Sequence, residues 1–229
     1  MTPTAATGAT KIMVIRHAEK PGTYSGQAYA GVSLNGLSCG KSGAEDLVTI
    51  GWQRAGALVS LFAPPWGPKA GLATPQFLFA ADPDPKKSKS SSSASSGDEP
   101  SQRPYETITP LAALLGVTIN KDFSKNHFSK MVDAALQCPG DVLICWQHQD
   151  IALGTAKQPG ISQVILTKTG TTGTMGIPAT WPTWPATKGT ARYDLVFVFD
   201  RPSGTGPITA FSIVPQLLLA GDHQWQQSG

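Results

Sequence analysis

The sequence predicts an α/β fold, a three-layer sandwich in which a mostly parallel, mixed sheet carries helices on both faces. The first observation is that short apolar runs, typical of buried strands, alternate with segments whose apolar residues recur at helical spacing. The second is size, because 229 residues of which 40% are hydrophobic suffice for one large domain with a sizeable core. We therefore expect a single domain over residues 1–229.

The first half of the chain supplies two predicted strands and one predicted helix. The run Ile12–Ile15 is short and rich in β-branched residues, which is typical of a buried strand. Residues 22–43 are rich in glycine, serine and asparagine, so we expect a long loop. Residues 47–62 gather apolar side chains at helical spacing and end before two prolines, which predicts a helix. Residues 76–81 form a second apolar strand.

The second half continues this alternation after one insert. The Ser/Lys-rich segment at 86–97 has nothing apolar to bury, so we expect it to be disordered. Two helices and three strands follow, at 104–115, 128–136, 141–146, 193–199 and 208–214. The last two strands are close enough in sequence to pair as an antiparallel hairpin. The Trp/Pro-rich stretch 177–190 cannot form a regular helix or a central strand.

Composition narrows the range of partners. Only 14% of the residues are charged, and no basic stripe interleaves with aromatic residues, so no nucleic-acid partner is expected. No apolar run approaches the length of a membrane span, and residues 1–10 lack the pattern of a signal peptide. The three cysteines show no C-x-x-C spacing. These features favour a cytoplasmic protein with no membrane partner.

Chemistry-bearing side chains follow two of the predicted strands. Arg16 and His17 close the first apolar run, and His148 follows the strand at 141–146. Arg103 stands at the start of a predicted helix, where backbone N–H groups and the helix dipole favour an anion. If the two strands are parallel neighbours, both imidazoles reach the carboxyl edge of the sheet, where ligands bind in such folds. Adjacent arginine and histidine suit a phosphate group and an attack upon it.

The segment Arg16–Pro21 resembles the signature loop of the histidine phosphatase (phosphoglycerate mutase-like) superfamily, in which Arg-His is followed by Gly or Ala. Residues 47–55 look like the first-helix pattern of that family, and Ser101–Thr107 is similar to its Ser…Arg…Glu-Thr element. Val142–His148 is similar to the strand that delivers its second catalytic histidine. The four motifs occur in the family's order and span residues 11 to 148.

The resemblance implies a metal-independent phosphatase without a cofactor, which hydrolyses a phosphomonoester or related phosphate. His17 would attack phosphorus to give a phosphohistidine, and water would then hydrolyse it. Arg16, Arg103 and His148 would hold the phosphoryl oxygens and offset charge in the transition state. His17 must be neutral to attack, whereas His148 could stay protonated beside the phosphate. The partner would be a small phosphate or a phosphoprotein; a metal ion is disfavoured because Arg16 would repel it.

The proton donor is where the chain departs from the family. Asp150, Asp122 and Glu19 are candidate acids, and none matches the family pattern cleanly. A leaving group that needs little protonation, such as an acyl phosphate or a phosphohistidine, would tolerate this gap. Arg54 is a further candidate phosphate ligand, but a structural role fits its place at the margin of an apolar helix face better. Two alternatives stay open: a non-catalytic binder of a phosphate metabolite or phosphoprotein, and a phosphomutase.

Overall fold

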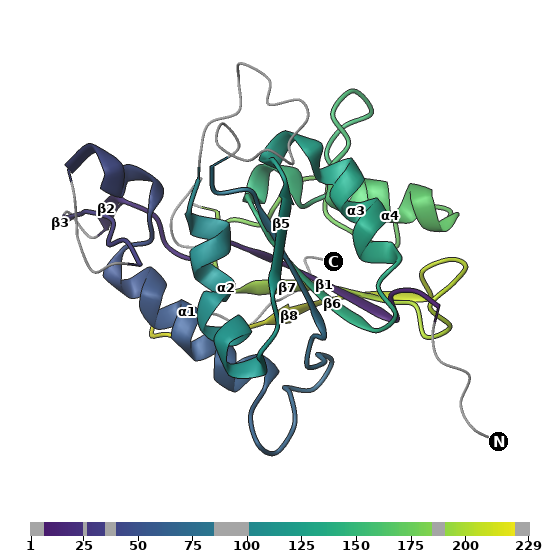
Figure 1. Cartoon of the computed structure of the whole chain (residues 1–229). Coiled ribbons are helices and arrows are strands. Elements are labelled where there is room, and N and C mark those ends of the chain that lie inside the picture. Colours follow the sequence, from purple (N-terminus) through teal and green to yellow (C-terminus); the bar gives the residue numbers. More distant parts are fainter. Residues whose placement is uncertain (1–6, 25–26, 35–39, 85–100, 185–190, 223–229) are drawn as a thin grey trace.

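A mixed six-stranded sheet forms the centre of the computed structural model, which describes residues 7–24, 27–34, 40–84, 101–184 and 191–222 (Figure 1). In sheet order the strands are β5 (Ile119–Phe123), β4 (Phe77–Ala81), β6 (Asp141–Trp146), β1 (Lys11–Arg16), β7 (Leu195–Asp200) and β8 (Ala210–Pro215). The first four run parallel, β7 runs antiparallel to β1, and β8 runs antiparallel to β7. The predicted mostly parallel, mixed sheet and its final hairpin are thereby confirmed.

Helices cover both faces of the sheet. They are α1 (Thr49–Phe62), α2 (Arg103–Leu115), α3 (Phe128–Leu136) and α4 (Ile161–Thr169). On β1, Met13 and Ile15 join the apolar cluster of α1 and α2, and the alternate residues Ile12 and Val14 join that of α3 and α4. This alternation is the period-two pattern of a strand buried on both faces. Figure 1 shows α1 and α2 on one side of the sheet and α3 and α4 on the other, which gives the predicted three layers.

Several elements differ from the sequence prediction. The helix expected from residue 47 begins at Thr49, because Val48 is its N-cap and has an extended backbone (φ −80°, ψ 168°). The Leu47 and Val48 N–H groups donate to Glu106 Oε2 and to the Glu19 carbonyl. Helix α2 matches the predicted range to within one residue and runs through Pro110; it ends at Leu115 and is capped by Gly116, whose φ of 64° is the left-handed conformation that glycine adopts readily.

Further elements were missed. The segment 22–43, expected as a loop, contains the two-stranded hairpin of β2 (Gly22–Tyr24) and β3 (Gln27–Tyr29) and leads into the 3-10 turn η1 (Gly40–Glu45). Strand β5 and helix α4 were not predicted either. The Ser/Lys-rich insert at 86–97 lies outside the described residues. Within the described ranges, no helix is long and apolar enough to cross a membrane.

Candidate active site

The pairing of β1 with β6 brings His17 and His148 to one edge of the sheet. The strands are parallel neighbours in a register that places Arg16 opposite Trp146. The His17 N–H continues the ladder by donating to the Trp146 carbonyl at 3.0 Å. His148 follows two residues later, at the start of the 3-10 turn η3 (His148–Asp150). Both histidines therefore lie at the carboxyl edge, where parallel sheets bind ligands.

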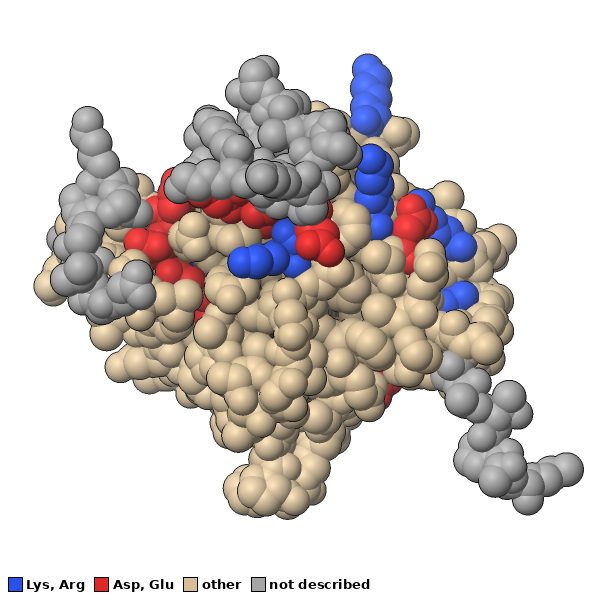
Figure 2. Space-filling view, in the orientation of Figure 1, with Lys and Arg blue, Asp and Glu red and all other residues tan. Residues whose placement is uncertain are grey.

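A pocket of about 420 Å³, including space open to solvent, lies between these histidines and the start of α2. Its lining consists of His17, Lys20, Ala81, Ser101, Arg103, Pro104, Lys125, Gln147, His148 and Gln149. Three of these side chains are cations, two are imidazoles, and none of the lining residues that the structure describes is a carboxylate. On the face shown in Figure 2, basic and acidic side chains both gather on the upper half, and the lower half is almost entirely uncharged. A pocket lined by three cations and two imidazoles, with no described carboxylate, suits an anion.

His17 is held as a neutral imidazole with one ring nitrogen available. Its Nδ1 lies 2.7 Å from the Ala18 carbonyl oxygen, which can only accept, so Nδ1 carries the proton and donates it. The lone pair is then on Nε2. Burial lowers the pKa of His17 well below its ordinary value, and the positive charges of Arg16 and Arg103 lower it further. A neutral, buried imidazole with a fixed tautomer is the state that a nucleophile requires.

Arg103 reaches the pocket from the first residue of α2. Its Nη1 donates to the Ala44 carbonyl at 2.8 Å, and its Nη2 forms an ion pair of 3.2 Å with Glu45. Its Nε is buried and has no hydrogen-bond partner among the described residues. The preceding residue, Gln102, makes no side-chain cap for the helix. The start of α2 therefore carries a guanidinium with one donor that has no described partner, at an end of the helix where the dipole favours an anion.

His148 is neutral when no anion is bound. Burial, followed by the charges of Arg16 and Lys20, lowers its pKa to about 4. Its Nδ1 is buried and lacks a hydrogen-bond partner in the described part of the chain. The protonated state expected beside a phosphate would require the bound anion to offset the neighbouring cations, and it stays a prediction.

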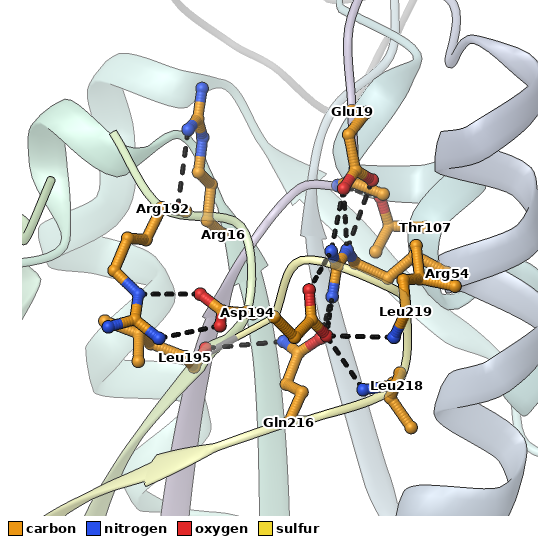
Figure 3. Close-up of polar contacts among 12 residues, drawn as sticks. Arg16, Glu19, Arg54, Thr107, Arg192, Asp194, Leu195, Gln216, Leu218 and Leu219 are labelled. Carbon is orange, nitrogen blue, oxygen red and sulfur yellow. Dashed lines mark hydrogen bonds and ion pairs between the residues drawn. The ribbon is translucent and has the colours of Figure 1, made fainter. Parts of the chain in front are cut away.

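Arg16, predicted as a phosphate ligand, contacts the segment before β7. Its Nη1 donates to the carbonyl oxygens of Ala191 and, at 3.4 Å, Arg192, as Figure 3 shows in part. Its guanidinium carbon lies 3.6 Å from the centre of the Tyr193 ring. Arg16 does not line the pocket, although its charge is close enough to lower the pKa of both His17 and His148. The described contacts make it an electrostatic neighbour of the pocket.

Arg54 and Glu19 form a buried ion pair outside the pocket (Figure 3). Arg54 donates Nε and Nη2 to Glu19 at 2.8 to 3.1 Å, Nη1 to Gln216 at 3.0 Å, and Nη1 and Nη2 to Asp222 at 3.0 and 2.8 Å. All five donors of the guanidinium are used. Burial opposes its charge, but hydrogen bonds to Asp222 and the charge of Glu19 outweigh this effect and raise the pKa of Arg54. Arg54 has no donor left for phosphate here, and both carboxylate oxygens of Glu19 accept hydrogen bonds from Arg54.

The two other candidate acids also lie outside the pocket lining. Asp122 is exposed on β5. Asp150 lies in η3, where its Oδ2 accepts from Gln147 Nε2. Burial raises the pKa of Asp150, despite that hydrogen bond and the charge of Lys125, so it holds a proton more readily than an exposed aspartate. None of the three predicted acids is brought to the pocket.

Sequence reasoning missed several lining residues. Lys20 belongs to the signature loop, three residues after His17, so its signal was available. Lys125 follows β5, which was not predicted, and therefore could not be placed at the carboxyl edge. Glu106, the glutamate of the Ser…Arg…Glu-Thr element, does not line the pocket: it is 1% exposed, and its Oε2 accepts from the Leu47 N–H at 2.8 Å. Burial raises the pKa of Glu106, and the nearby charge of Asp46 raises it further.

The arrangement combines an Nε2 lone pair with cations that would neutralise a phosphoryl group. No family model matches the chain, and no match was found among curated proteins. The pocket itself and the motifs that surround it are therefore the basis on which function is inferred.

Proposed function

We propose that this chain is a metal-independent phosphatase, which hydrolyses a phosphomonoester or related phosphate through a phosphohistidine on His17. The observation that carries the proposal is the state of His17: a neutral imidazole, with Nδ1 bonded to the Ala18 carbonyl, in a pocket lined by three cations and no carboxylate among the described residues. Repulsion between anions is the main obstacle to bringing a nucleophile to a phosphate, and this pocket avoids it by pairing a neutral nucleophile with a cationic lining.

The reaction has two displacements. In the first, Nε2 forms a bond to phosphorus as the bond from phosphorus to the leaving oxygen breaks. In the second, water attacks the phosphohistidine, phosphate leaves, and the lone pair returns to Nε2. Arg103, Lys20 and Lys125 offset the phosphoryl charge, and His148 becomes a hydrogen-bond donor when the bound anion raises its pKa.

The lining also bears on the substrate. Because no described lining residue is a carboxylic acid, a leaving group that departs without protonation fits best, such as an acyl phosphate or a phosphohistidine. Only Ala81 and Pro104 are apolar, which favours a small hydrophilic phosphate or a phosphorylated side chain over a bulky aromatic ester. The same lack of an acid supports a second candidate function, the binding of a phosphate metabolite or phosphoprotein without turnover.

Trapping the covalent intermediate separates these functions. Wild type is mixed with ³²P-labelled acetyl phosphate in the presence of a chelator, then quenched in alkali, which preserves phosphohistidine. We expect labelled protein in wild type and in the control His127→Ala, whose imidazole bonds to Ser124 outside the pocket. No label is expected in His17→Ala. Binding of inorganic phosphate without label or turnover would favour the non-catalytic function, and label that persists in His17→Ala would overturn the nucleophile.

A further inference from the structure

Thr107 is a buried hydroxyl that joins α2 to the loop carrying His17. It lies one helical turn after Arg103 and is 0% exposed. Its Oγ1 accepts from the Ala18 N–H at 2.8 Å and donates to the Arg103 carbonyl at 2.7 Å. One side chain is thereby bonded to both the loop after the nucleophile and the residue that begins the phosphate-binding helix.

The contacts form a chain that ends on the His17 ring. Thr107 fixes the N–H of Ala18, and the carbonyl of the same residue accepts from His17 Nδ1 at 2.7 Å. His17 itself is held at its N–H by Trp146, and Glu19 is held at its carbonyl by Val48. Ala18 lies between these two anchored residues, and the Thr107 hydroxyl is the group that sets its orientation from the helix.

The bond from Thr107 to Ala18 is the informative one. A helical threonine commonly donates to the carbonyl four residues earlier, so the bond to Arg103 alone indicates no role in a site. Thr109, on the same helix, makes the equivalent bond to the Tyr105 carbonyl at 2.8 Å, and its hydroxyl makes no other hydrogen bond among the described residues. The two threonines differ in the contact with the His17 loop.

We propose that Thr107 is a positioning residue for His17. Through Ala18 it keeps a carbonyl at Nδ1, and this directs the lone pair of the ring to Nε2, the nitrogen that attacks. The inference rests on the proposed function for its kinetic consequence, but the tautomer of His17 is a property of the resting protein. Because Thr107 also bonds to the first residue of α2, the same hydroxyl fixes the spacing between the nucleophile and Arg103.

The test uses Thr107→Val, which keeps the shape and loses the hydrogen bonds, with Thr109→Val as the matched control. ¹⁵N NMR of the histidine rings reports the tautomer, with the His17 signal assigned by its loss in His17→Gln. We expect the Nδ1–H form of His17 to dominate in wild type and in Thr109→Val, and to mix with the Nε2–H form in Thr107→Val. A displacement of about 1 Å can cost about 10²-fold in rate, so phosphorylation of His17 by acetyl phosphate should fall at least about 10-fold in single turnover.

Two further measurements distinguish positioning from stability. Thr107→Ser keeps the hydroxyl and should restore the rate to within about threefold of wild type, by the same displacement argument. The Kd for inorganic phosphate should change little in Thr107→Val, because Arg103 and the lysines remain. If Thr107→Val does not fold, Thr107→Cys, whose thiol is a weaker acceptor, takes its place in the same measurements.

The outcomes separate this inference from the function on which it rests. If Thr107→Val keeps the wild-type tautomer of His17 and is phosphorylated as fast as Thr109→Val, the positioning role is overturned and the proposed phosphatase function is unaffected. If wild type forms no phosphohistidine, the proposed function fails, and the tautomer measurement still decides whether Thr107 orients the ring.

Discussion

Arg54 on α1 and Arg103 on α2 lie on neighbouring helices over the same face of the sheet, yet their guanidinium groups have opposite surroundings. Arg54 is 2% exposed and bonds with all five donors to Glu19, Gln216 and Asp222. Arg103 has one carboxylate partner, Glu45, and an Nε without a partner among the described residues. The difference teaches that saturation of the donors, more than burial or sequence position, distinguishes a structural arginine from one that can take a ligand.

The positions of the two residues in their helices strengthen this contrast. Arg54 lies in the middle of α1 and draws carboxylates from two distant segments, so its charge is neutralised within the fold. Arg103 is the first residue of α2, where the helix dipole makes a cation unfavourable by about 0.3–1 kcal/mol. An anion bound at that end would be stabilised by both the arginine and the dipole.

Loss of Arg54 should cause the largest effect, and the effect should be on stability. Arg54→Ala leaves the buried carboxylates of Glu19 and Asp222 without their cation. Removing one partner of a buried ion pair costs about 3–5 kcal/mol, which is a factor of roughly 10² to 5 × 10³ in the folding equilibrium. Urea unfolding measures this free energy directly. Phosphate affinity at 10 °C, per folded molecule, should stay near wild type, and a stable Arg54→Ala protein that no longer binds phosphate would reverse the assignment.

Loss of Arg103 should act on turnover and leave stability nearly unchanged. Removing one preorganised donor aimed at the transition state costs about 10² to 10³ in kcat. Arg103→Ala should show this loss with acetyl phosphate, and its melting temperature should stay near wild type because its ion pair with Glu45 is partly exposed. Arg103→Lys should recover little, since an ammonium cannot reproduce the planar fork. Near-full turnover in Arg103→Ala would require another residue to hold the phosphoryl group.

The two arginines also show which parts of the structure could be predicted from the sequence. Strand β6 and helix α3 were predicted to the residue, because an apolar run and a helical spacing are signals local to each element. Strand β5 was missed because it is an edge strand whose only buried residue is Ile119. Local signals were also sufficient for part of the site, because His17, His148 and Arg103 could be placed from the ends of predicted strands and helices.

The ion-pair and hydrogen-bond partners of these side chains could not be predicted from the sequence. Glu19 lies 35 residues from Arg54 and Asp222 lies 168 residues from it, and nothing in either local sequence indicates their pairing. Glu19 was therefore retained as a candidate acid and Arg54 as a candidate ligand. Arg16 illustrates the same limit, because its carbonyl acceptor at Ala191 comes from the far end of the chain.

Titration of His148 gives a smaller, pH-dependent effect. Burial and the charges of Arg16 and Lys20 lower its pKa to about 4, and a bound dianion should raise it. The complex then holds more protons than the free protein, so affinity rises as pH falls from the pKa in the complex towards 4. Sulfate is the suitable probe because it stays a dianion over this range. From pH 7 to pH 5 its Kd should fall by about 3- to 10-fold, with a limit of tenfold per pH unit for one proton.

The control for this titration is His148→Asn, which keeps a polar side chain that cannot be protonated. Its sulfate affinity should vary less with pH than that of wild type. An unchanged slope in His148→Asn would assign the titration to another group, of which Asp150 is the nearest candidate in sequence.

Removing the carboxylate of Glu45 should produce the smallest effect. It widens the difference between the two arginines, because Arg103 loses its ion-pair partner while Arg54 keeps Glu19 and Asp222. Glu45 is 40% exposed in its side chain and competes with a bound phosphate for Arg103 Nη2. An exposed ion pair is worth about 0–1 kcal/mol, so Glu45→Gln should lower the Kd for inorganic phosphate by about two- to fivefold and scarcely move the melting temperature. The matched control is Asp133→Asn, which removes the partner of Lys168 from a surface pair between α3 and α4 and should leave phosphate affinity unchanged. The gain in Glu45→Gln should shrink when salt is raised from roughly 0.05 M to 0.5 M, because screening weakens the repulsion that Glu45 exerted on the anion. An unaltered Kd in Glu45→Gln, with the Asp133→Asn control behaving as expected, would mean that phosphate does not engage Arg103.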